Sequence, residues 1–321
     1  MSGPDPIPAP PPRPTGGRIW LLHAGVIAAL GAAQFLLPDY QQLMMTRIMV
    51  LACYASGYNL LFGYAGLLSL GHAMFFAAGM YGAGLPAYHA GWGAGTAFLA
   101  GTGAGAALAL AVGLLALRTT GVAFMIVTMM FAQVAHLGIL YFTEWTRGEE
   151  GLSLPAAARR LGPFDLADPV VRYNLALALL AVTLAVVLAA ARAPFGRALV
   201  AIRENEPRTR MLGYDTFRLK LAALVLSGTL AAAAGAAYGL LFGYIGATFA
   251  GVQYSIEALL FTLLGGAGTV LGPLLGTALM TWMIDAASDV TSAWLLAVGV
   301  VLIGIVLFFR KGLLGRVPWL P

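Results

Sequence analysis

The sequence predicts an all-α protein that crosses a membrane about ten times. Three observations support this class. Of the 321 residues, 60% are hydrophobic and 10% are charged, whereas a soluble domain carries roughly 25% charged residues. Long apolar runs alternate with short polar segments, as in helical membrane proteins. The basic residues gather in a few of those segments, so the net charge of +5 indicates membrane topology and not nucleic-acid binding.

The first half of the chain contains five predicted spans. Residues 1–17 are rich in proline and lack apolar periodicity, which predicts a disordered cytoplasmic tail. The next apolar run is long enough for an uncleaved first helix instead of a signal peptide. A turn is expected at Pro38–Gln42. The five spans are Ile19–Leu37, Leu43–Phe62, one within Gly63–Gly84, Ala94–Leu117 and Gly121–Phe142.

Six glycines interrupt the apolar stretch Gly63–Gly84, which also contains Ser69 and His72. A broken backbone is tolerated at membrane depth only where neighbouring protein covers it, and small residues let helices approach closely. We therefore expect a broken helix here, with Ser69 and His72 as candidates for lining a translocation pathway. The alternative is that these two side chains only hydrogen-bond helices to one another.

The second half contains five further predicted spans. The mixed-charge segment Thr143–Arg172 precedes them and suits the outer face. Glu257 is the only acid well within a span, and such acids are functional candidates by default. The alternative is an outer-end residue that hydrogen-bonds a neighbouring helix. The motif GGAGTVLGP divides one apolar region, so one helix there is short or broken. The spans are Tyr173–Ala191, Leu219–Phe242, Gln253–Leu264, Leu274–Ala287 and Ala293–Phe309.

The stretch Pro194–Lys220 is the longest polar segment between two long apolar runs. Its basic residues predict a cytoplasmic loop, because short cytoplasmic loops are enriched in Lys and Arg. Ala198, Leu199 and Ile202 are spaced to line one face of a short helix. The opposite face then carries Arg197, Arg203 and Glu204.

Two signals divide and end this helical segment. Pro207 breaks the helix or begins a second one after Glu206, and Gly213 is placed to end it. Composition leaves two interpretations open, an amphipathic loop on lipid headgroups and a docking surface for a soluble partner. Both chain termini are expected on the same side as this loop, and Arg47 is the main exception to the charge pattern.

An internal echo indicates two inverted five-helix halves. Tyr58–Gly71 reads YNLLFGYAGLLSLG and Tyr238–Gly251 reads YGLLFGYIGATFAG, with eight identical positions. The first copy ends an inward span and the second ends an outward span. Inverted repeats are common in transporters, with the pathway at their interface. The alternative is coincidence within Leu- and Gly-rich sequence.

Motifs for enzyme chemistry are missing from the sequence. Neither Lys220 nor Lys311 lies in a P-loop motif, so the chain is not expected to bind ATP in that way. The four histidines are not spaced as ligand pairs, and Cys53, the one cysteine, is expected to be a small buried hydrophobe. We therefore expect no enzyme activity, no catalytic residues, no cofactor and no metal.

The chain resembles permeases of the branched-chain amino acid ABC transporter family, of the LivM type. The matching motifs are spread over residues from about 45 to 310, in the family's order, and are specific for the family more than for its cargo. They are GYAGLLSLGHAMFFAAGMYGAG, GVAFMIVTMMFAQV, PFGRALVAIRENEPRTRMLGYDTFRLKL and SIEALLFTLLGGAGTVLGPLLG.

The resemblance implies a permease domain at residues 18–311 in a bacterial inner (plasma) membrane, with a short cytoplasmic tail at 312–321. It also implies a second related permease, two cytoplasmic ATPases and a periplasmic or extracellular binding protein as partners. The family's coupling segment falls within residues 194–218, where it would sit in a groove on an ATPase. The coupling residues carried over are Arg197, Ala201, Arg203, Glu204, Glu206, Arg208 and Gly213.

Two points qualify the resemblance. The outer loop reads TRGEEGL, where the family has a Thr-Gly-Gly-like start, so Arg147 alters an expected outer contact. Related permeases also move urea, short amides and other amino acids, so the cargo stays open. The alternative class is a stand-alone secondary transporter or channel for small polar solutes, with Glu257 as its candidate coupling-ion site.

Overall fold

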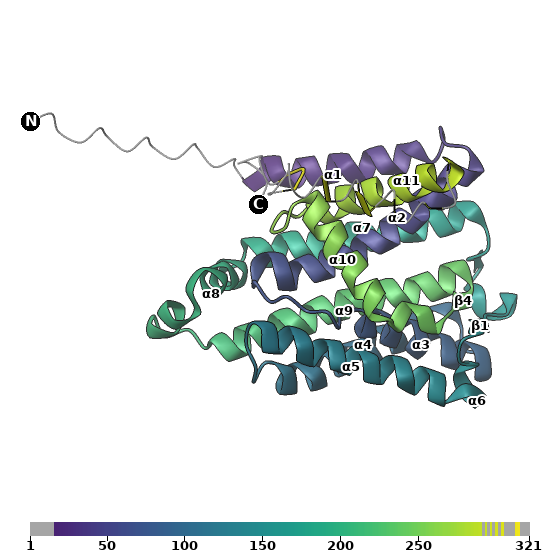
Figure 1. Ribbon diagram of the computed structural model, residues 1–321. Helices are drawn as coiled ribbons and strands as arrows, with labels where there is room; N and C mark the ends of the chain where they lie inside the picture. The colour runs from purple at the N-terminus through teal and green to yellow at the C-terminus, as the bar shows by residue number, and fades with distance from the viewer. Residues whose placement is uncertain are drawn as a thin grey trace, which may run out of the picture.

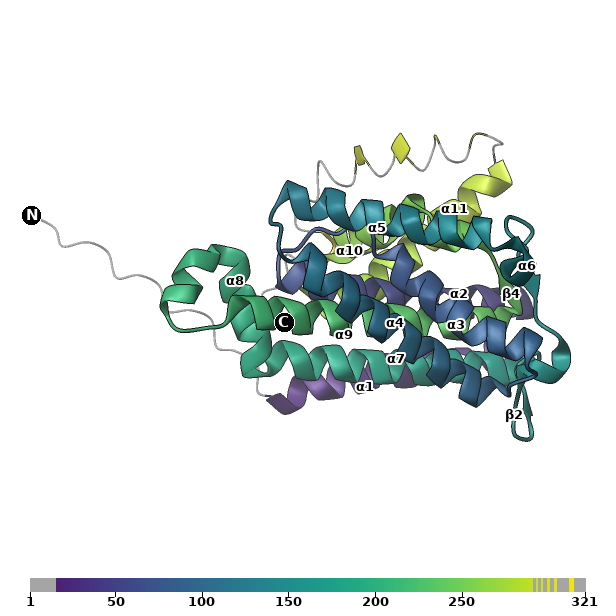
Figure 2. The same ribbon diagram turned by 90° about the horizontal axis from the view of Figure 1, so that it is seen from below.

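The computed structural model describes residues 16–290 and, beyond them, residues 293, 296, 299–300, 303–304 and 312–314. Long helices run lengthwise, side by side, through this part of the chain (Figures 1 and 2). They are α1 Gly16–Ala33, α2 Asp39–Asn59, α3 Ala73–His89, α4 Ala94–Ala116, α5 Val122–Tyr141, α7 Pro169–Arg192, α9 Thr216–Phe242, α10 Val252–Gly265 and α11 Gly272–Val290.

The remaining elements are short, apart from α8, and lie at the ends of the bundle or within its breaks. Helix α8, Pro194–Met211, forms one end, here called the α8 end, and the strands lie at the opposite end (Figure 1). The short elements are the π-helix η1 Leu60–Tyr64, α6 Thr143–Thr146, β1 Leu152–Ser153, η2 Ala156–Arg159, β2 Arg160–Leu161, β3 Phe164–Asp165, β4 Tyr244–Ile245 and η3 Ala247–Ala250.

The predicted all-α polytopic class is confirmed. Each of the first nine predicted spans overlaps a long helix within the described residues. Of these helices, α4, α5, α7 and α9 are both long and apolar enough to cross a membrane by length and composition. The predicted span Ala293–Phe309 and both predicted tails lie largely outside the described residues.

Helix α2 begins earlier than expected. The predicted turn at Pro38–Gln42 ends at Pro38, and the helix starts at Asp39. Pro38 has an extended backbone, and a carboxylate in the first turn favours a helix N-terminus. At the start of α7, the carboxylate of Asp168 accepts a hydrogen bond of 2.8 Å from the backbone of Val170 and so caps the N-terminus of the helix.

Glycines bring α3 and α9 into close contact at the centre of the bundle. A Cβ atom added to Gly79 of α3 would overlap the carbonyl oxygen of Ala232. A Cβ atom added to Gly235 of α9 would overlap the carbonyl oxygen of Phe76. The two backbones therefore pack closely only because these positions lack side chains.

The two copies of the internal echo lie at opposite ends of the bundle. Helices α2 and α9 pack against each other, and Gly57, near the end of α2, lies against Ser227 in the first half of α9. Tyr64, in the first copy, packs in a cluster with Leu199 of α8. Tyr244, in the second copy, pairs with Ser153 at the strand end. This antiparallel placement is the one that an inverted repeat requires.

Short strands and a partly buried arginine hold together the end of the bundle opposite α8. Strand β1 pairs antiparallel with β4, with Leu152 opposite Ile245, and β2 pairs with β3 in a hairpin. The guanidinium of Arg159 donates to the carbonyls of Leu240, at 3.0 Å, and Leu241, at 2.6 Å. These carbonyls lie in the last turn of α9, where they have no hydrogen-bond donor within the helix, and Arg159 supplies that donor.

Candidate functional site

The predicted division of α8 is confirmed. Asn205 has φ −159° and ψ 95°, which interrupts the helix. Its side-chain oxygen accepts a hydrogen bond of 2.9 Å from the backbone of Arg208, so Asn205 is the N-terminal cap of the second part. Pro207 lies in the first turn of that part, where it costs no hydrogen bond. Gly213 follows the helix with φ +88°, a conformation that favours glycine.

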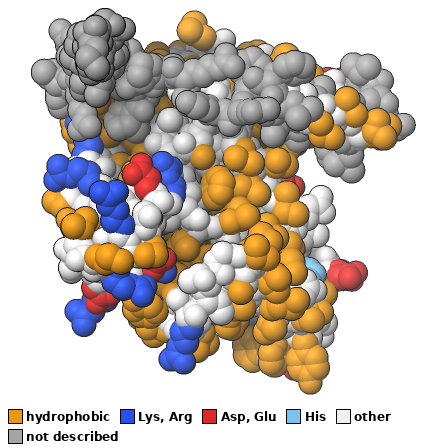
Figure 3. All heavy atoms as spheres, turned by 60° about the vertical axis from the view of Figure 1, so that its left-hand side comes forward, with side chains coloured by type: hydrophobic (Ala, Val, Ile, Leu, Met, Phe, Trp, Pro, Cys, Tyr) orange, Lys and Arg blue, Asp and Glu red, His pale blue; other side chains and the backbone are white. Residues whose placement is uncertain are grey.

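The amphipathic face of α8 is also confirmed. Ala198, Leu199 and Ile202 are buried against the bundle. The other predicted coupling residues lie along the outer surface: Arg197, Arg203, Glu204 and Arg208 are exposed, and Ala201 and Glu206 are half-buried. Figure 3 shows basic side chains gathered at this end of the molecule, with apolar side chains among them.

Arg203 connects α8 to the broken backbone of the bundle. Its guanidinium donates a hydrogen bond to the carbonyl of Gly63 in η1. Beside it, the side chain of Asn59 bonds the backbone of Gly268 at 2.8 Å and of Thr269 at 2.8 Å. Arg203 therefore lies where the two glycine-rich stretches predicted to be broken come together, although its sequence position shows nothing of this contact.

A partly buried ion pair holds the second part of α8 against α9. The carboxylate of Glu206 lies 2.7 Å from the ammonium of Lys220, whose side chain is 5% exposed. Arg210 lies 3.2 Å from the same carboxylate. Burial raises the pKa of Glu206, but the hydrogen bond and charge of Lys220 outweigh it, so the pKa lies below its ordinary value. Glu206 is therefore ionised at neutral pH.

The tip of this end carries an apolar group that sequence reasoning missed. Met211 is 85% exposed and Leu212 is 72% exposed, and Tyr214 and Phe217 follow them at the surface. Thr120, from the α4–α5 connection, lines a hollow with Pro207 and Met211. Exposed apolar residues next to arginines are typical of a contact surface. This group could have been predicted from the sequence, because its residues are apolar within an otherwise polar loop.

Two half-helices meet in the interior. After η1 the chain is irregular until α3 begins at Ala73, and after α9 the short elements β4 and η3 lead to α10 at Val252. The backbone of Ala73 donates a hydrogen bond of 2.8 Å to the side-chain oxygen of Ser255, in the first turn of α10. The N-termini of α3 and α10 thus lie together inside the bundle, an arrangement typical of transporter binding regions.

Ser69 and His72 lie beside this junction, and both are buried. The ring of His72 stacks on Tyr54 at 5.7 Å, and its Nε2 atom is 3.3 Å from the hydroxyl of Ser227. Ser69 accepts a hydrogen bond of 3.2 Å from Gly71. The contacts of His72 join neighbouring helices, whereas that of Ser69 stays within its own connection, and the Nδ1 atom of His72 has no hydrogen-bond partner among the described residues. A pathway role stays a prediction.

Glu257 lies on α10, half-buried, within two turns of the start of that helix. Because α10 begins beside the N-terminus of α3, Glu257 lies near that junction. Its role in a pathway also stays a prediction. Among the described residues no cluster of His, Cys, Asp and Glu could hold a metal ion.

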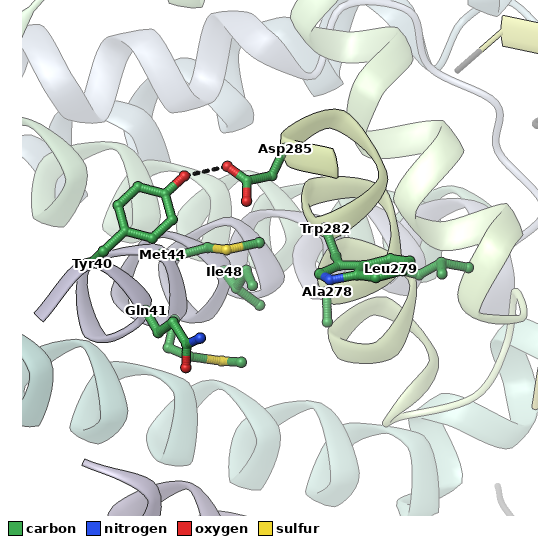
Figure 4. Close-up of a pocket in the computed structure, with 9 residues that line it drawn as sticks. Tyr40, Gln41, Met44, Ile48, Ala278, Leu279, Trp282 and Asp285 are labelled. Atoms are coloured by element: carbon green, nitrogen blue, oxygen red, sulfur yellow. Dashed lines mark hydrogen bonds between the residues drawn. The ribbon is translucent and has the colours of Figure 1, made fainter. Parts of the chain in front are cut away.

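Two further polar contacts lie toward the opposite end. Arg147 donates to the hydroxyl of Tyr88 at 2.9 Å, so this residue holds the connection after α6 to α3. Tyr40 of α2 donates a hydrogen bond to Asp285 of α11. Figure 4 shows this bond at the rim of a pocket between the two helices, with Trp282 and Met44 in its walls.

Comparison with known proteins assigns the family. The family model described as branched-chain amino acid transport system / permease component matches residues 42–310. The chain belongs to this permease family. LivM, the high-affinity branched-chain amino acid transport permease of Salmonella typhimurium, is 28% identical over 319 residues, covering 92% of this chain and 75% of LivM. The LivM protein of Escherichia coli is 29% identical over 291 residues, covering 84% and 68%.

A second group of relatives has another cargo in its name. The autoinducer 2 import system permease LsrC of Salmonella typhi is 33% identical over 193 residues, covering 55% of this chain and 54% of LsrC. No solved structure matches the chain. The family is therefore shown over most of the sequence, and the LivM and LsrC relatives are permease components of transport systems.

Proposed function

We propose that this permease forms half of the membrane passage of an ATP-driven importer for branched-chain or related amino acids. A second related permease completes the passage, two cytoplasmic ATPases drive it, and a binding protein outside the membrane delivers the cargo. The LivM relatives support the amino-acid cargo. The lack of a P-loop motif in the sequence supports a partner as the source of energy.

The double attachment of α8 is the observation that carries this proposal. Its outer surface offers arginines and an apolar tip at Met211 and Leu212. Arg203, although exposed, reaches from α8 to the carbonyl of Gly63. A soluble ATPase that grips the tip and rotates would pull on the stretch that leads into α3. Such a movement changes which side of the membrane reaches the interior.

The test separates docking from transmission. In membranes that contain all partner subunits, Arg208→Glu with Leu212→Asp should lower ATPase co-purification by about tenfold or more, because both changes oppose a basic and apolar contact. Arg160→Glu, at an exposed basic position at the opposite end of the bundle, is the matched control. Arg203→Met should keep the ATPases bound and lose transport, since it removes the bond to Gly63.

Two results would contradict the proposal. One is full ATPase co-purification with the Arg208→Glu, Leu212→Asp variant. The other is uptake by the purified chain in vesicles without ATPases, which would favour a stand-alone transporter or channel. Uptake of labelled L-leucine against labelled urea by the complete complex distinguishes the two cargo classes.

A further inference from the structure

Arg47 is an exposed charge within a membrane helix. It lies on α2 eight residues after Asp39, so at 1.5 Å per residue it is about 12 Å along the helix from the opposite end. Its side chain is exposed on the surface of the described bundle. A guanidinium at this depth is costly in contact with lipid, and such residues generally face protein or a water-filled cavity. The face that carries Arg47 therefore needs a polar surrounding.

Glu257 supplies the opposite charge from the neighbouring helix. Tyr54 of α2 and Tyr254 of α10 stack with ring centroids 5.5 Å apart, which fixes the facing sides of the two helices. Arg47 precedes Tyr54 by seven residues and Glu257 follows Tyr254 by three, so both charges project on those facing sides. Glu257 is half-buried and Arg47 is exposed.

The two charges interact without closing on each other. Arg47 acts electrostatically on the carboxylate of Glu257, and both act on the phenol of Tyr238 in α9, to which Arg47 also hydrogen-bonds. Among the described residues, however, the ion pairs within 4.0 Å join Glu206, Asp215 and their basic partners, and Arg47 with Glu257 is not one of them. A guanidinium and a carboxylate on facing helix sides thus lie near each other without forming an ion pair, with the Tyr238 phenol beside them.

We propose that Arg47 and Glu257 bind the two ends of a zwitterionic amino acid during its passage, the guanidinium taking the α-carboxylate and the carboxylate taking the ammonium group. This inference rests on the proposed function and names the chemistry of its cargo site. The planar guanidinium matches a carboxylate with two parallel hydrogen bonds. A Glu carboxylate accepts from an ammonium group. The site also explains why Arg47 is an exception to the predicted charge pattern, in which the arginines gather on the cytoplasmic side.

The experiment measures ATP-dependent uptake of labelled L-leucine by the complete complex in proteoliposomes. Arg47→Gln and Glu257→Gln should each lower uptake by about ten- to a hundredfold, as expected when one charged hydrogen-bond partner is removed. Co-purification of the ATPases should be unchanged. Arg160→Gln and Glu144→Gln remove the same charges from exposed positions of the outer loops and are the matched controls.

The double variant separates cargo binding from a structural pair. If Arg47 and Glu257 only stabilise each other, the variant with both glutamines relieves the unpaired charge and should recover uptake. Recovery would overturn the proposal. If each holds one end of the cargo, the double variant is at least as defective as either single one.

A labelling measurement covers the case in which these variants fail to assemble. Gln253, exposed one turn before Glu257 on α10, is changed to Cys in a Cys53→Ala background. A polar thiol reagent should label it, and transport conditions with leucine should slow the labelling. Complete lack of labelling would place this face in lipid and overturn the proposal.

Failure of this inference differs from failure of the proposed function. Unchanged leucine uptake in both single glutamine variants would overturn the Arg47–Glu257 site and leave the importer intact. A wild-type complex that takes up urea and not leucine would overturn the amino-acid cargo, and this site with it.

Discussion

Neutralising Glu206 should loosen the second part of α8 from the bundle. The change Glu206→Gln leaves the ammonium of Lys220, 5% exposed, without its anion. Breaking a fully buried pair costs about 3–5 kcal/mol, and the partial exposure of Glu206 lowers this cost. We therefore expect about 1–3 kcal/mol, which corresponds to about 5- to 150-fold in the local opening equilibrium.

Amide hydrogen exchange of residues 206–214 measures this opening directly. The matched control is Asp215→Asn, because the pair of Arg218 and Asp215 is exposed, at 85% and 54% of the two side chains. Asn keeps the N-terminal cap that Asp215 provides to α9, so this change should alter the opening by less than about 0.5 kcal/mol. Equal exchange in the two variants would refute the reasoning.

The pH dependence of the wild-type segment has a definite sign. The folded-state pKa of Glu206 is lowered by Lys220, so the pair contributes its full stability above the unfolded-state pKa of glutamate. That contribution is lost as the pH falls through the lowered folded-state pKa. The opening equilibrium of residues 206–214, obtained by dividing the exchange rate by the intrinsic amide rate at each pH, should thus be steady near neutral pH and rise in acid. Glu206→Gln should show no such acid step.

Two further predictions concern packing and capping. Gly235→Ala should destabilise the protein by about 1–3 kcal/mol, because its Cβ would overlap the Phe76 carbonyl. Gly103→Ala, where no atom lies within 4 Å of an added Cβ, should leave the stability unchanged. Equal melting temperatures of the two variants would contradict this prediction. Arg159→Met removes charged hydrogen bonds to the end of α9 and should cost about 1.5–3 kcal/mol, measured by thermal unfolding. Arg160→Met, at an exposed position, is its control, and no difference between the two would argue against the cap.

Local signals were sufficient to predict the organisation of α8. Proline and glycine act on their own backbone, so the break near Pro207 and the end at Gly213 follow from their positions. The buried face of Leu199 and Ile202 follows from helical spacing. The start of α2 was predicted a few residues late because Asp39 was assigned to a turn instead of to a first helical turn.

The structure of the glycine-rich stretch Gly63–Gly84 could not be predicted from local signals alone. Gly79 was grouped with the glycines of a broken helix, yet it lies inside the continuous helix α3. Glycine permits both a break and a close contact, and only the neighbouring helix distinguishes them. The break itself falls earlier, between η1 and Ala73.

Side-chain partners far apart in sequence were beyond prediction. Arg203 was expected to face an ATPase, and its guanidinium also reaches Gly63, 140 residues earlier. In the sequence, Arg47 is an exception to the charge pattern and Glu257 is an acid within a span, but nothing in their spacing joins them. Their relation depends on the packing of α2 against α10.

The sequence by itself determined the membrane class, the order of the spans, the family and the amphipathic character of α8, because hydrophobicity, charge and turn chemistry are properties of neighbouring residues. Tertiary structure decided which broken ends meet, which charges pair and which arginine reaches the interior. The physical reason is that helices of similar apolar composition can pack in many arrangements, and close backbone contacts and specific hydrogen bonds select one of them.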